Sequence, residues 1–328
     1  MGVDVLCVGQ AGLDAIIGGV DLADFAVTER EFTPAKGGVY ISTGGDSANE
    51  SAVLIKLGIK AGIVAEVKDD PVGRLVRDIL IDKGVDTTFL VVSPRAEVDS
   101  VPNLVFVMPD ASRKFLGMDI DKKRLKQIPF DESVLDNIKV LSLASMGAEP
   151  FIEDEGIEFV RRITKRAKDA GAVVCADVLA TRWRVDPRVY PELFEYIDYL
   201  FPNDYEAMAL TGADTIEEAA DIFLSTGLGT VIIKTGKKGC YVKTKDGRSF
   251  TVPTYTALKA IDTTGAGDNF AAGFICGICE GKDLVECCRI GHATASIAVT
   301  EYTTTKGVQS REQVAEVMEK YDPEKTGS

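Results

Sequence analysis

The stretch Asp262-Thr263-Thr264-Gly265-Ala266-Gly267-Asp268 leads directly into the apolar run Asn269-Phe270-Ala271-Ala272-Gly273-Phe274-Ile275. A loop of small residues that opens a helix presents unpaired backbone N–H groups and the positive end of the helix dipole, which suits an anionic phosphate. Asp268 places a carboxylate beside those donors. A carboxylate that accepts a hydroxyl proton next to an anion hole is the minimum requirement of a kinase, and a plain helix cap at Asp268 is the alternative.

Upstream of this loop, short apolar runs alternate with segments of helical periodicity. We expect strands at residues 3–9, 61–67, 101–108, 140–143, 173–177, 199–201 and 230–234, helices at 47–57, 73–83, 155–170 and 216–224, and a hairpin at 240–252. Strands separated by helices of about 10 to 15 residues predict an α/β fold, with a doubly wound, mostly parallel sheet flanked by helices. No repeat or linker interrupts the sequence, so residues 1–328 are expected to form a single domain.

Polar or small residues follow several of the expected strands. Asp14, Asp177, Asn203 and Gly236 each come just after one, and Asp14 is expected in the loop that the first strand opens into. Ligands of open parallel sheets bind beyond the carboxyl ends of the strands. The sequence therefore predicts that these residues converge on one rim of the sheet.

Composition and charge exclude several classes of partner. Hydrophobic residues make up 45% and charged residues 27%, as in ordinary globular proteins, and the formal net charge is −14. A field of that sign repels nucleic acid and anionic membranes, so neither is expected as a partner. The sequence shows no signal peptide and no transmembrane run of about 20 apolar residues.

The cysteines point to the same kind of protein. There are seven, an odd number, and they are scattered through apolar runs, which indicates reduced thiols and a cytoplasmic location. Cys276 and Cys279 form a C-x-x-C pair that would suit zinc, but the residues between them are apolar and helical in pattern. Buried thiols are the favoured interpretation.

A second motif, Gly44-Gly45-Asp46-Ser47-Ala48-Asn49, precedes the expected helix at 47–57. The two glycines let the backbone pass close to a ligand, and the Asn49 amide can bind a sugar hydroxyl. Taken alone, this motif is more typical of a turn and helix cap than of a ligand site.

Together the two motifs resemble the signatures of the ribokinase-like PfkB family of carbohydrate kinases. Gly44-Gly45 with Asn49, Ala52 and Leu57-Gly58 is similar to the first signature of the family. Residues 262–268 are similar to the second. Asn203-Asp204-Tyr205-Glu206 resembles the N-x-x-E motif of the family, and residues 292–300 are similar to its nucleotide-side helix. The resemblance spans residues 3 to about 315.

The resemblance implies an ATP-dependent sugar kinase with a small β lid. Residues of about 15–42 and 95–116 would form this lid, and such enzymes often form homodimers through it. Asp268 would be the general base, and the backbone amides of Gly265, Ala266 and Gly267 the anion hole. The implied acceptor-binding residues are Asp14, Gly44, Gly45 and Asn49, and the implied nucleotide-binding residues are Asn203, Lys234, Gly236, Gly239 and His292. Glu206, with Asp204 as a second acidic candidate, would act near Mg²⁺, through water. Asp262 and Thr264 match a loop that binds K⁺ in some members.

Departures from the family pattern leave the acceptor and the cation open. The loop at residues 301–307 is longer than in ribokinases, which puts potassium activation in doubt. Asp46 replaces a lysine typical of ribokinases, residues 144–147 lack the expected acidic ribose contact, and residues 177–183 only loosely resemble the pattern of many hexose kinases. Neither ribose nor fructose is therefore assigned.

Three other functions remain as alternatives. A nucleoside kinase would need aromatic residues in the lid, which Phe32, Tyr40, Phe106 and Phe115 supply. A silent sugar- or nucleotide-binding regulator conflicts with the intact Asp268 and Glu206. A dinucleotide-dependent oxidoreductase is disfavoured because residues 9–14 lack the G-x-G-x-x-G fingerprint.

Overall fold

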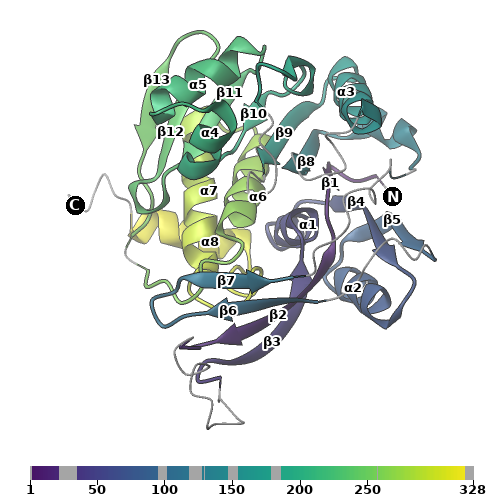
Figure 1. Ribbon diagram of the computed structural model, residues 1–328, viewed down its shortest axis with the longest axis vertical. Coiled ribbons are helices and arrows are strands. Elements are labelled where there is room, and N and C mark those ends of the chain that lie inside the picture. Colours follow the sequence, from purple (N-terminus) through teal and green to yellow (C-terminus); the bar gives the residue numbers. More distant parts are fainter. Residues whose placement is uncertain are drawn as a thin grey trace.

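A nine-stranded sheet forms the centre of the protein (Figure 1). The computed structural model describes residues 2–21, 35–94, 102–117, 128, 130–146, 154–178, 186–256 and 258–321. The strand order is β13-β12-β11-β10-β9-β8-β1-β4-β5, and every pairing from β11 to β5 is parallel. The strands are β1 Val5–Val8, β4 Ala61–Lys68, β5 Asp86–Ser93, β8 Val140–Met146, β9 Val173–Val178, β10 Tyr199–Leu200, β11 Thr230–Lys234, β12 Cys240–Thr244 and β13 Ser249–Val252.

The central strand β1 is buried along its whole length, as expected for a parallel strand covered on both faces. Its alternate residues enter different cores. Leu6 and Val8 belong to the cluster that includes residues of α3 Asp154–Asp169, α4 Asp204–Thr211 and α5 Ile216–Ser225.

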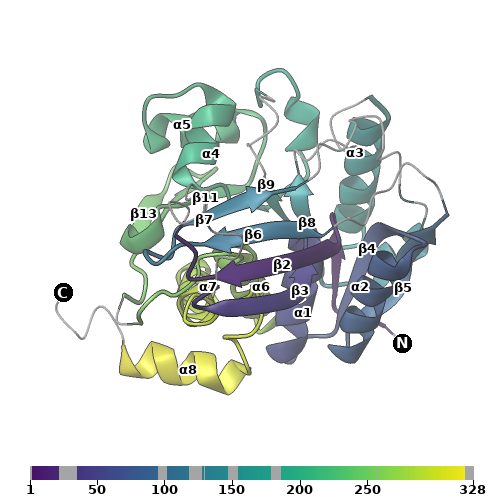
Figure 2. The same cartoon turned by 60° about the horizontal axis from the view of Figure 1, so that its bottom comes forward.

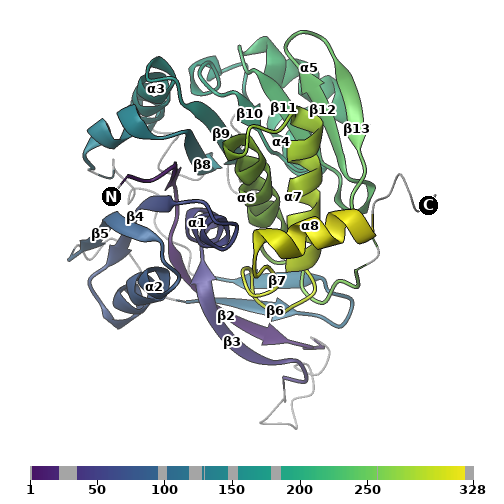
Figure 3. The same cartoon turned by 180° about the vertical axis from the view of Figure 1, so that it is seen from behind.

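Val5 and Cys7 face the opposite core. That core includes residues of α1 Asp46–Lys56, α6 Ala266–Cys279, α7 Leu284–Ala298 and α8 Arg311–Lys320, which Figure 3 shows from behind. The remaining α-helix of the described residues, α2 Pro71–Asp82, packs against β4 and β5. Within the described residues, no helix is long and apolar enough to cross a membrane.

A second sheet, of four strands, lies apart from the first in the order β3-β2-β6-β7. It consists of β2 Gly12–Gly18, β3 Gly38–Gly44, β6 Asn103–Val107 and β7 Arg113–Leu116. Figure 2 shows this sheet spread across one side of the molecule, in front of α1, α6 and α7. The segments expected to form a lid, 15–42 and 95–116, contribute to it, but β2 begins earlier and β3 ends later, while residues 22–34 and 95–101 lie outside the described part of the chain.

The expected α/β architecture is confirmed, but some local expectations were wrong and some elements, α8 among them, were not expected. Asp14 lies inside β2 rather than in a loop after the first strand. The apolar segment after Asp268 forms two helices, α6 and α7, separated by a turn in which Gly281 has a φ of 71°. The sequence did not predict β5, whose residues alternate irregularly between buried, partly buried and exposed positions. It did not predict α4 either, because Asn203 and Glu206 at its start were interpreted as a motif that acts near Mg²⁺.

Candidate active site

The glycine-rich loop ends at the N-terminus of α6, as the sequence predicted. Gly265 precedes the helix with a φ of 73°, and a Cβ atom on it would lie 2.7 Å from Cβ of Thr304, so this position requires glycine. The Ala266 amide donates to Thr263 O at 3.3 Å. Within the described part of the chain, no acceptor is found for the amides of Gly265 and Gly267. Those two amides are therefore the better placed donors for an anion.

Asp268 lies in the first turn of α6 and remains partly accessible to solvent. Its Oδ2 accepts a hydrogen bond from Asn49 Nδ2 at 2.8 Å. Burial raises the pKa of Asp268 to about 6, while the Asn49 bond opposes the rise, Asp177 adds to it, and Lys234 and Arg113 oppose it. Near neutral pH most of this carboxylate is ionised and able to accept a proton.

The orientation of the Asn49 amide follows from its partners. Asn49 Oδ1 accepts from Thr304 Oγ1 at 2.8 Å and from Thr43 Oγ1 at 3.4 Å, so the NH₂ group faces Asp268. Asn269 Nδ2 donates to Gly265 O at 2.8 Å and to Thr304 O at 2.7 Å. Thr304, from the long loop 301–307, thus links the two sequence motifs, and the sequence analysis did not identify it.

Asp14, Gly44 and Gly45 lie beside Asn49, where β2 and β3 meet α1. Asp14 Oδ1 accepts from Asn103 Nδ2 at 3.1 Å, and burial raises the pKa of Asp14. A side chain at Gly44 would collide with the Asp14 carboxylate, and Gly45 has a φ of 86°. The structure therefore brings all four predicted acceptor residues together. Asp14 and Gly44 reach this place on strands of the second sheet, not at the rim of the nine-stranded sheet.

The second sheet is also tied to the glycine-rich loop. Arg113 of β7 donates from Nη1 to Thr263 O at 2.9 Å and to Thr263 Oγ1 at 2.6 Å. Sequence analysis did not identify Arg113, and the one available signal was a basic residue within the segment expected to form the lid. Through this contact the sheet reaches the residues just before the N-terminus of α6.

Asp262 and Thr264 shape that loop from within. Asp262 Oδ1 accepts from Thr264 N at 2.8 Å and Thr264 Oγ1 at 2.6 Å, and Oδ2 accepts from Thr303 N at 3.3 Å. Lys56 Nζ donates to two carbonyls near the long loop, Thr305 O at 2.6 Å and Val308 O at 2.8 Å. Donors of the protein itself therefore contact the Asp262 carboxylate and these two carbonyls.

Asn203 and Glu206 form a capping box at the start of α4. Glu206 N donates to Asn203 Oδ1 at 2.8 Å, and Asn203 N donates to Glu206 Oε2 at 2.8 Å. Burial raises the pKa of Glu206 to about 7, and the charge of Asp177 adds to the effect. Asp204 is exposed. In the described residues, no group of three or more His, Cys, Asp or Glu side chains is placed to hold a metal ion.

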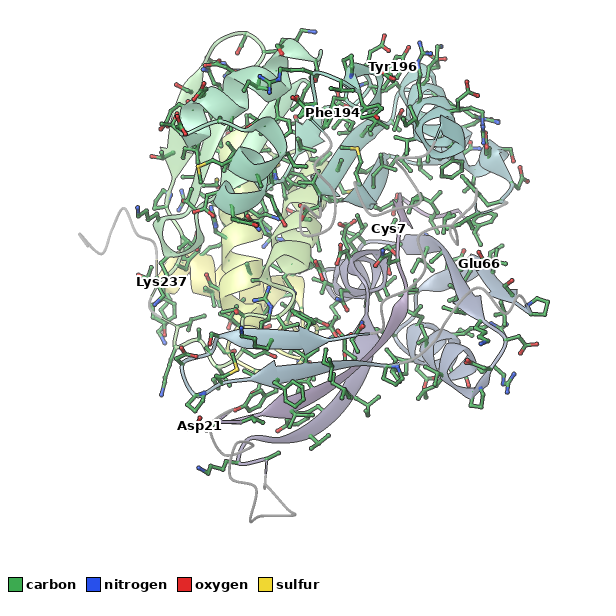
Figure 4. The ribbon with its side chains drawn as sticks, viewed as in Figure 1. Cys7, Asp21, Glu66, Phe194, Tyr196 and Lys237 are labelled. Atoms are coloured by element: carbon green, nitrogen blue, oxygen red, sulfur yellow. The ribbon has the colours of Figure 1, made fainter. Side chains whose placement is uncertain are left out.

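Three of the predicted nucleotide residues lie at the turn between β11 and β12, where Lys234 ends β11 and Gly236 and Gly239 flank the turn. Gly236 and Gly239 have φ values of 60° and 98°, and Thr235 Oγ1 donates to Gly239 O at 2.9 Å. Lys237 of this turn lies at the periphery of the molecule (Figure 4). His292 is buried on α7, its ring 4.9 Å from that of Phe270, and within the described residues its Nε2 has no partner.

Lys234 differs from the other predicted nucleotide residues because its side chain points toward α6. Its Nζ lies 2.7 Å from Asp177 Oδ2, at the end of β9. A Cβ atom on Gly267 would lie 3.1 Å from the same Nζ. The sequence predicted Asp177 at the rim formed by the carboxyl ends of the strands, but it did not predict a contact with Lys234. A single sequence does not show which residue a carboxylate meets.

Comparisons with known proteins identify the family. The profile of the pfkB family carbohydrate kinases matches residues 5–311. The chain belongs to the PfkB family. A ribokinase of Haemophilus influenzae is 28% identical over 291 residues, covering 85% of this chain and 88% of the relative. A 5-dehydro-2-deoxygluconokinase of Bacillus subtilis is 25% identical over 282 residues, covering 84% and 86%.

Solved structures agree with this PfkB assignment. Arabidopsis thaliana ribokinase, solved with ribose and ATP, has a TM-score of 0.77 at 25% identity, covering 97% of this chain and 99% of that one. A ribokinase-like protein of Escherichia coli, solved with ATP and Mg²⁺, has a TM-score of 0.75 at 20% identity and the same coverage. The ribokinase-like fold and the enzyme class expected from the two motifs are thus confirmed, and this PfkB protein is a sugar kinase.

Proposed function

We propose that this PfkB protein transfers the γ-phosphoryl group of ATP to a hydroxyl group of a sugar or sugar-like polyol. The contact between Asn49 and Asp268, 2.8 Å long, carries the proposal because it joins the acceptor motif to the carboxylate beside the anion hole. Asp268 is the general base, and the amides of Gly265, Ala266 and Gly267 form the anion hole. Gly265 and Gly267 carry most of that role, since the Ala266 amide has an acceptor of its own.

In the proposed reaction the acceptor hydroxyl gives its proton to the Asp268 carboxylate as its oxygen attacks the γ-phosphorus. The new O–P bond forms while the bond to the bridging oxygen of ADP breaks, and ADP leaves with the electron pair. The amides at the start of α6 stabilise the charge on the transferring group. Asp14, Gly44, Gly45 and Asn49 hold the acceptor so that the attacking hydroxyl faces Asp268.

The nucleotide is proposed to bind along the ends of β10 and β11, with its base near α7. Asn203, Lys234, Gly236, Gly239 and His292 would contact it, and Glu206 would hold Mg²⁺ through water. When bound, Mg²⁺ would neutralise charge on the phosphates. The E. coli structural neighbour solved with ATP and Mg²⁺ supports this pair of ligands.

The second sheet is proposed to act as a lid within a single kinase domain. Arg113 ties β7 to Thr263, and Asp14 of β2 belongs to the acceptor site, so movement of this sheet would open and close both. A closed lid excludes water and protects the phosphoryl group from hydrolysis. The seven free cysteines support a cytoplasmic location for this enzyme.

We also propose that the lid mediates a homodimer. Val39 and Ile41 of β3 and Leu116 of β7 are 64%, 54% and 60% exposed. The strand register places them on one face of the lid, opposite the face that carries Tyr40, whose ring stacks on Tyr302. An exposed apolar face of this kind is suited to a second copy of the same sheet.

A nucleoside acceptor is the second candidate. Phe115 is 56% exposed, and the register places it in one row with Val105, Ile16 and Tyr40, on the face of the lid toward Tyr302. An exposed ring on this face is suited to stacking on a base. Of the other lid aromatics, Phe106 lies on the opposite face and Phe32 lies outside the described residues.

The test is a coupled ADP-release assay with Mg-ATP against sugars, polyols and nucleosides, run in parallel on Asp268→Asn. An acceptor that drives ADP release in the wild type but not in the variant supports the proposal and names the substrate class. Turnover that Asp268→Asn retains would contradict the role of the base. Release with nucleosides alone would favour the second candidate.

A further inference from the structure

Lys234 supplies a largely buried cation to the site. Its side chain is 15% exposed and that of Asp177 is 13% exposed, and their charged atoms are 2.7 Å apart. The backbone of Lys234 forms a bridge with Asn203, the first residue of the proposed magnesium motif. The ammonium group therefore lies where β9, β11, α4 and α6 come together.

The charges around this ammonium are unbalanced. Three carboxylates, those of Asp177, Glu206 and Asp268, interact electrostatically with Lys234. A phosphoryl group brings further negative charge into a protein whose net charge is already −14. A fixed positive group beside the transferring phosphate is what such a site requires, because charge stabilisation supplies much of the catalysis in phosphoryl transfer.

The position of the ammonium matches the anion hole. A Cβ atom on Gly267 would lie 3.1 Å from Lys234 Nζ, so the ammonium lies directly beside the backbone of Gly267, whose amide belongs to the proposed anion hole. Nζ has three N–H donors, and within the described residues it donates to Asp177. The remaining N–H groups are available to phosphate oxygens.

We propose that Lys234 is a catalytic residue whose ammonium group donates a hydrogen bond to a non-bridging oxygen of the transferring phosphoryl group, while Asp177 holds it in position. This inference rests on the proposed function, and it moves Lys234 from the nucleotide loop to the reacting phosphate. Proton transfer and bond cleavage proceed as described above, and Lys234 stays protonated throughout.

A purely structural role would make Lys234 no more than the charge partner of Asp177. The two roles are separated by Lys234→Met, Asp177→Asn and the double variant, because the double variant removes both buried charges together. Thermal unfolding, kcat with Mg-ATP and the acceptor found in the ADP-release assay, and calorimetric affinities for Mg-ADP and the non-hydrolysable Mg-AMP-PNP are measured for each protein.

We expect Lys234→Met to lower kcat by about 10²- to 10³-fold and to weaken Mg-AMP-PNP by about 10-fold while leaving Mg-ADP nearly unchanged. The unfolding temperature of the double variant should be closer to that of the wild type than the unfolding temperature of Lys234→Met is. The kcat of the double variant should nevertheless stay as low as that of Lys234→Met. Recovery of kcat in the double variant to the level of Asp177→Asn would overturn the inference, as would an equal loss of affinity for both nucleotides. The nucleotide affinities test Lys234 even if no acceptor is found, whereas the response to Asp268→Asn tests the proposed function.

Discussion

The amide nitrogen of Asn49 lies 2.8 Å from the carboxylate of Asp268, although 219 positions separate the two residues. The contact connects α1 to α6, the helices that carry the two sequence motifs. Thr304 and Thr43 donate to Oδ1 of Asn49 and so fix the orientation of its amide group. The proposed general base and the proposed acceptor site are thereby held in one geometry.

Removing the charge of the base should remove catalysis and spare nucleotide binding. We expect Asp268→Asn to lower kcat by about 10²- to 10⁴-fold, because the amide cannot accept the hydroxyl proton. Calorimetry with Mg-ADP should give an affinity close to that of the wild type. Asp110→Asn, on the exposed turn between β6 and β7, is a matched control that should retain full activity.

The rate should depend on pH through the ionisation of Asp268. Its pKa is raised to about 6, so kcat/KM should fall as the pH drops below that value and level off above it. Asn49 stabilises the ionised form, so Asn49→Ala should move this acid limb to higher pH. A pH–rate profile of both proteins tests this, and a limb that moves to lower pH in the variant would contradict the assignment.

Glu50 should make the protein less stable as the pH rises. Burial raises its pKa from 4.5 to about 7, although Ser142 and Cys7 donate to it. Because the folded state holds this proton more tightly than the unfolded state, the cost develops as pH rises from about 4.5 and is complete above about 7. Glu50→Gln should therefore be more stable than the wild type at pH 8, by about 1 to 3 kcal/mol.

Urea unfolding at pH 5 and at pH 8 checks this prediction. The advantage of Glu50→Gln should shrink at the lower pH, where the glutamic acid is already neutral in the fold. An equal difference at both pH values would mean that Glu50 is ionised in the folded protein. Glu316→Gln is the control, because Glu316 lies on α8 and is exposed.

Turnover should not require potassium. Lys56 donates to the carbonyls of Thr305 and Val308, and both oxygens of Asp262 accept from protein donors. Initial rates in potassium chloride and in tetramethylammonium chloride at equal ionic strength should agree within about two-fold, since screening is matched. A large activation by K⁺ alone would show that the cation displaces these contacts.

Disrupting the apolar lid face should produce monomers. Val39→Glu places a charge on that face, and burying it against a second copy would be costly. Light scattering should then report a monomer, against a dimer for the wild type. Val189→Glu, at a position 62% exposed outside the lid, is the control and should leave the dimer intact. A monomeric wild type would contradict the proposed dimer.

Several features were predictable because neighbouring residues in the sequence produce them. β1 and the first five residues of β4 are runs of apolar or small residues that a sheet covered on both faces buries, so the parallel α/β fold followed from such runs. The start of α6 was predictable because small residues and an apolar helical run are adjacent in the chain. The capping box of α4 also lies within four consecutive residues, yet its helix was missed when Asn203 and Glu206 were considered only as ligands.

Other features depend on residues that meet only in the folded protein. Asp14 follows the first strand in the sequence, but pairing with β3 and β6 makes it part of a second sheet. The contacts of Asp177 with Lys234, of Arg113 with Thr263, and of Thr304 with Asn49 join segments 57, 150 and 255 positions apart. The sequence alone determined which side chains and backbone groups were available for phosphoryl transfer. The tertiary structure decided which of them meet, because a hydrogen bond requires approach to about 3 Å, and local patterning does not specify such distances between remote segments.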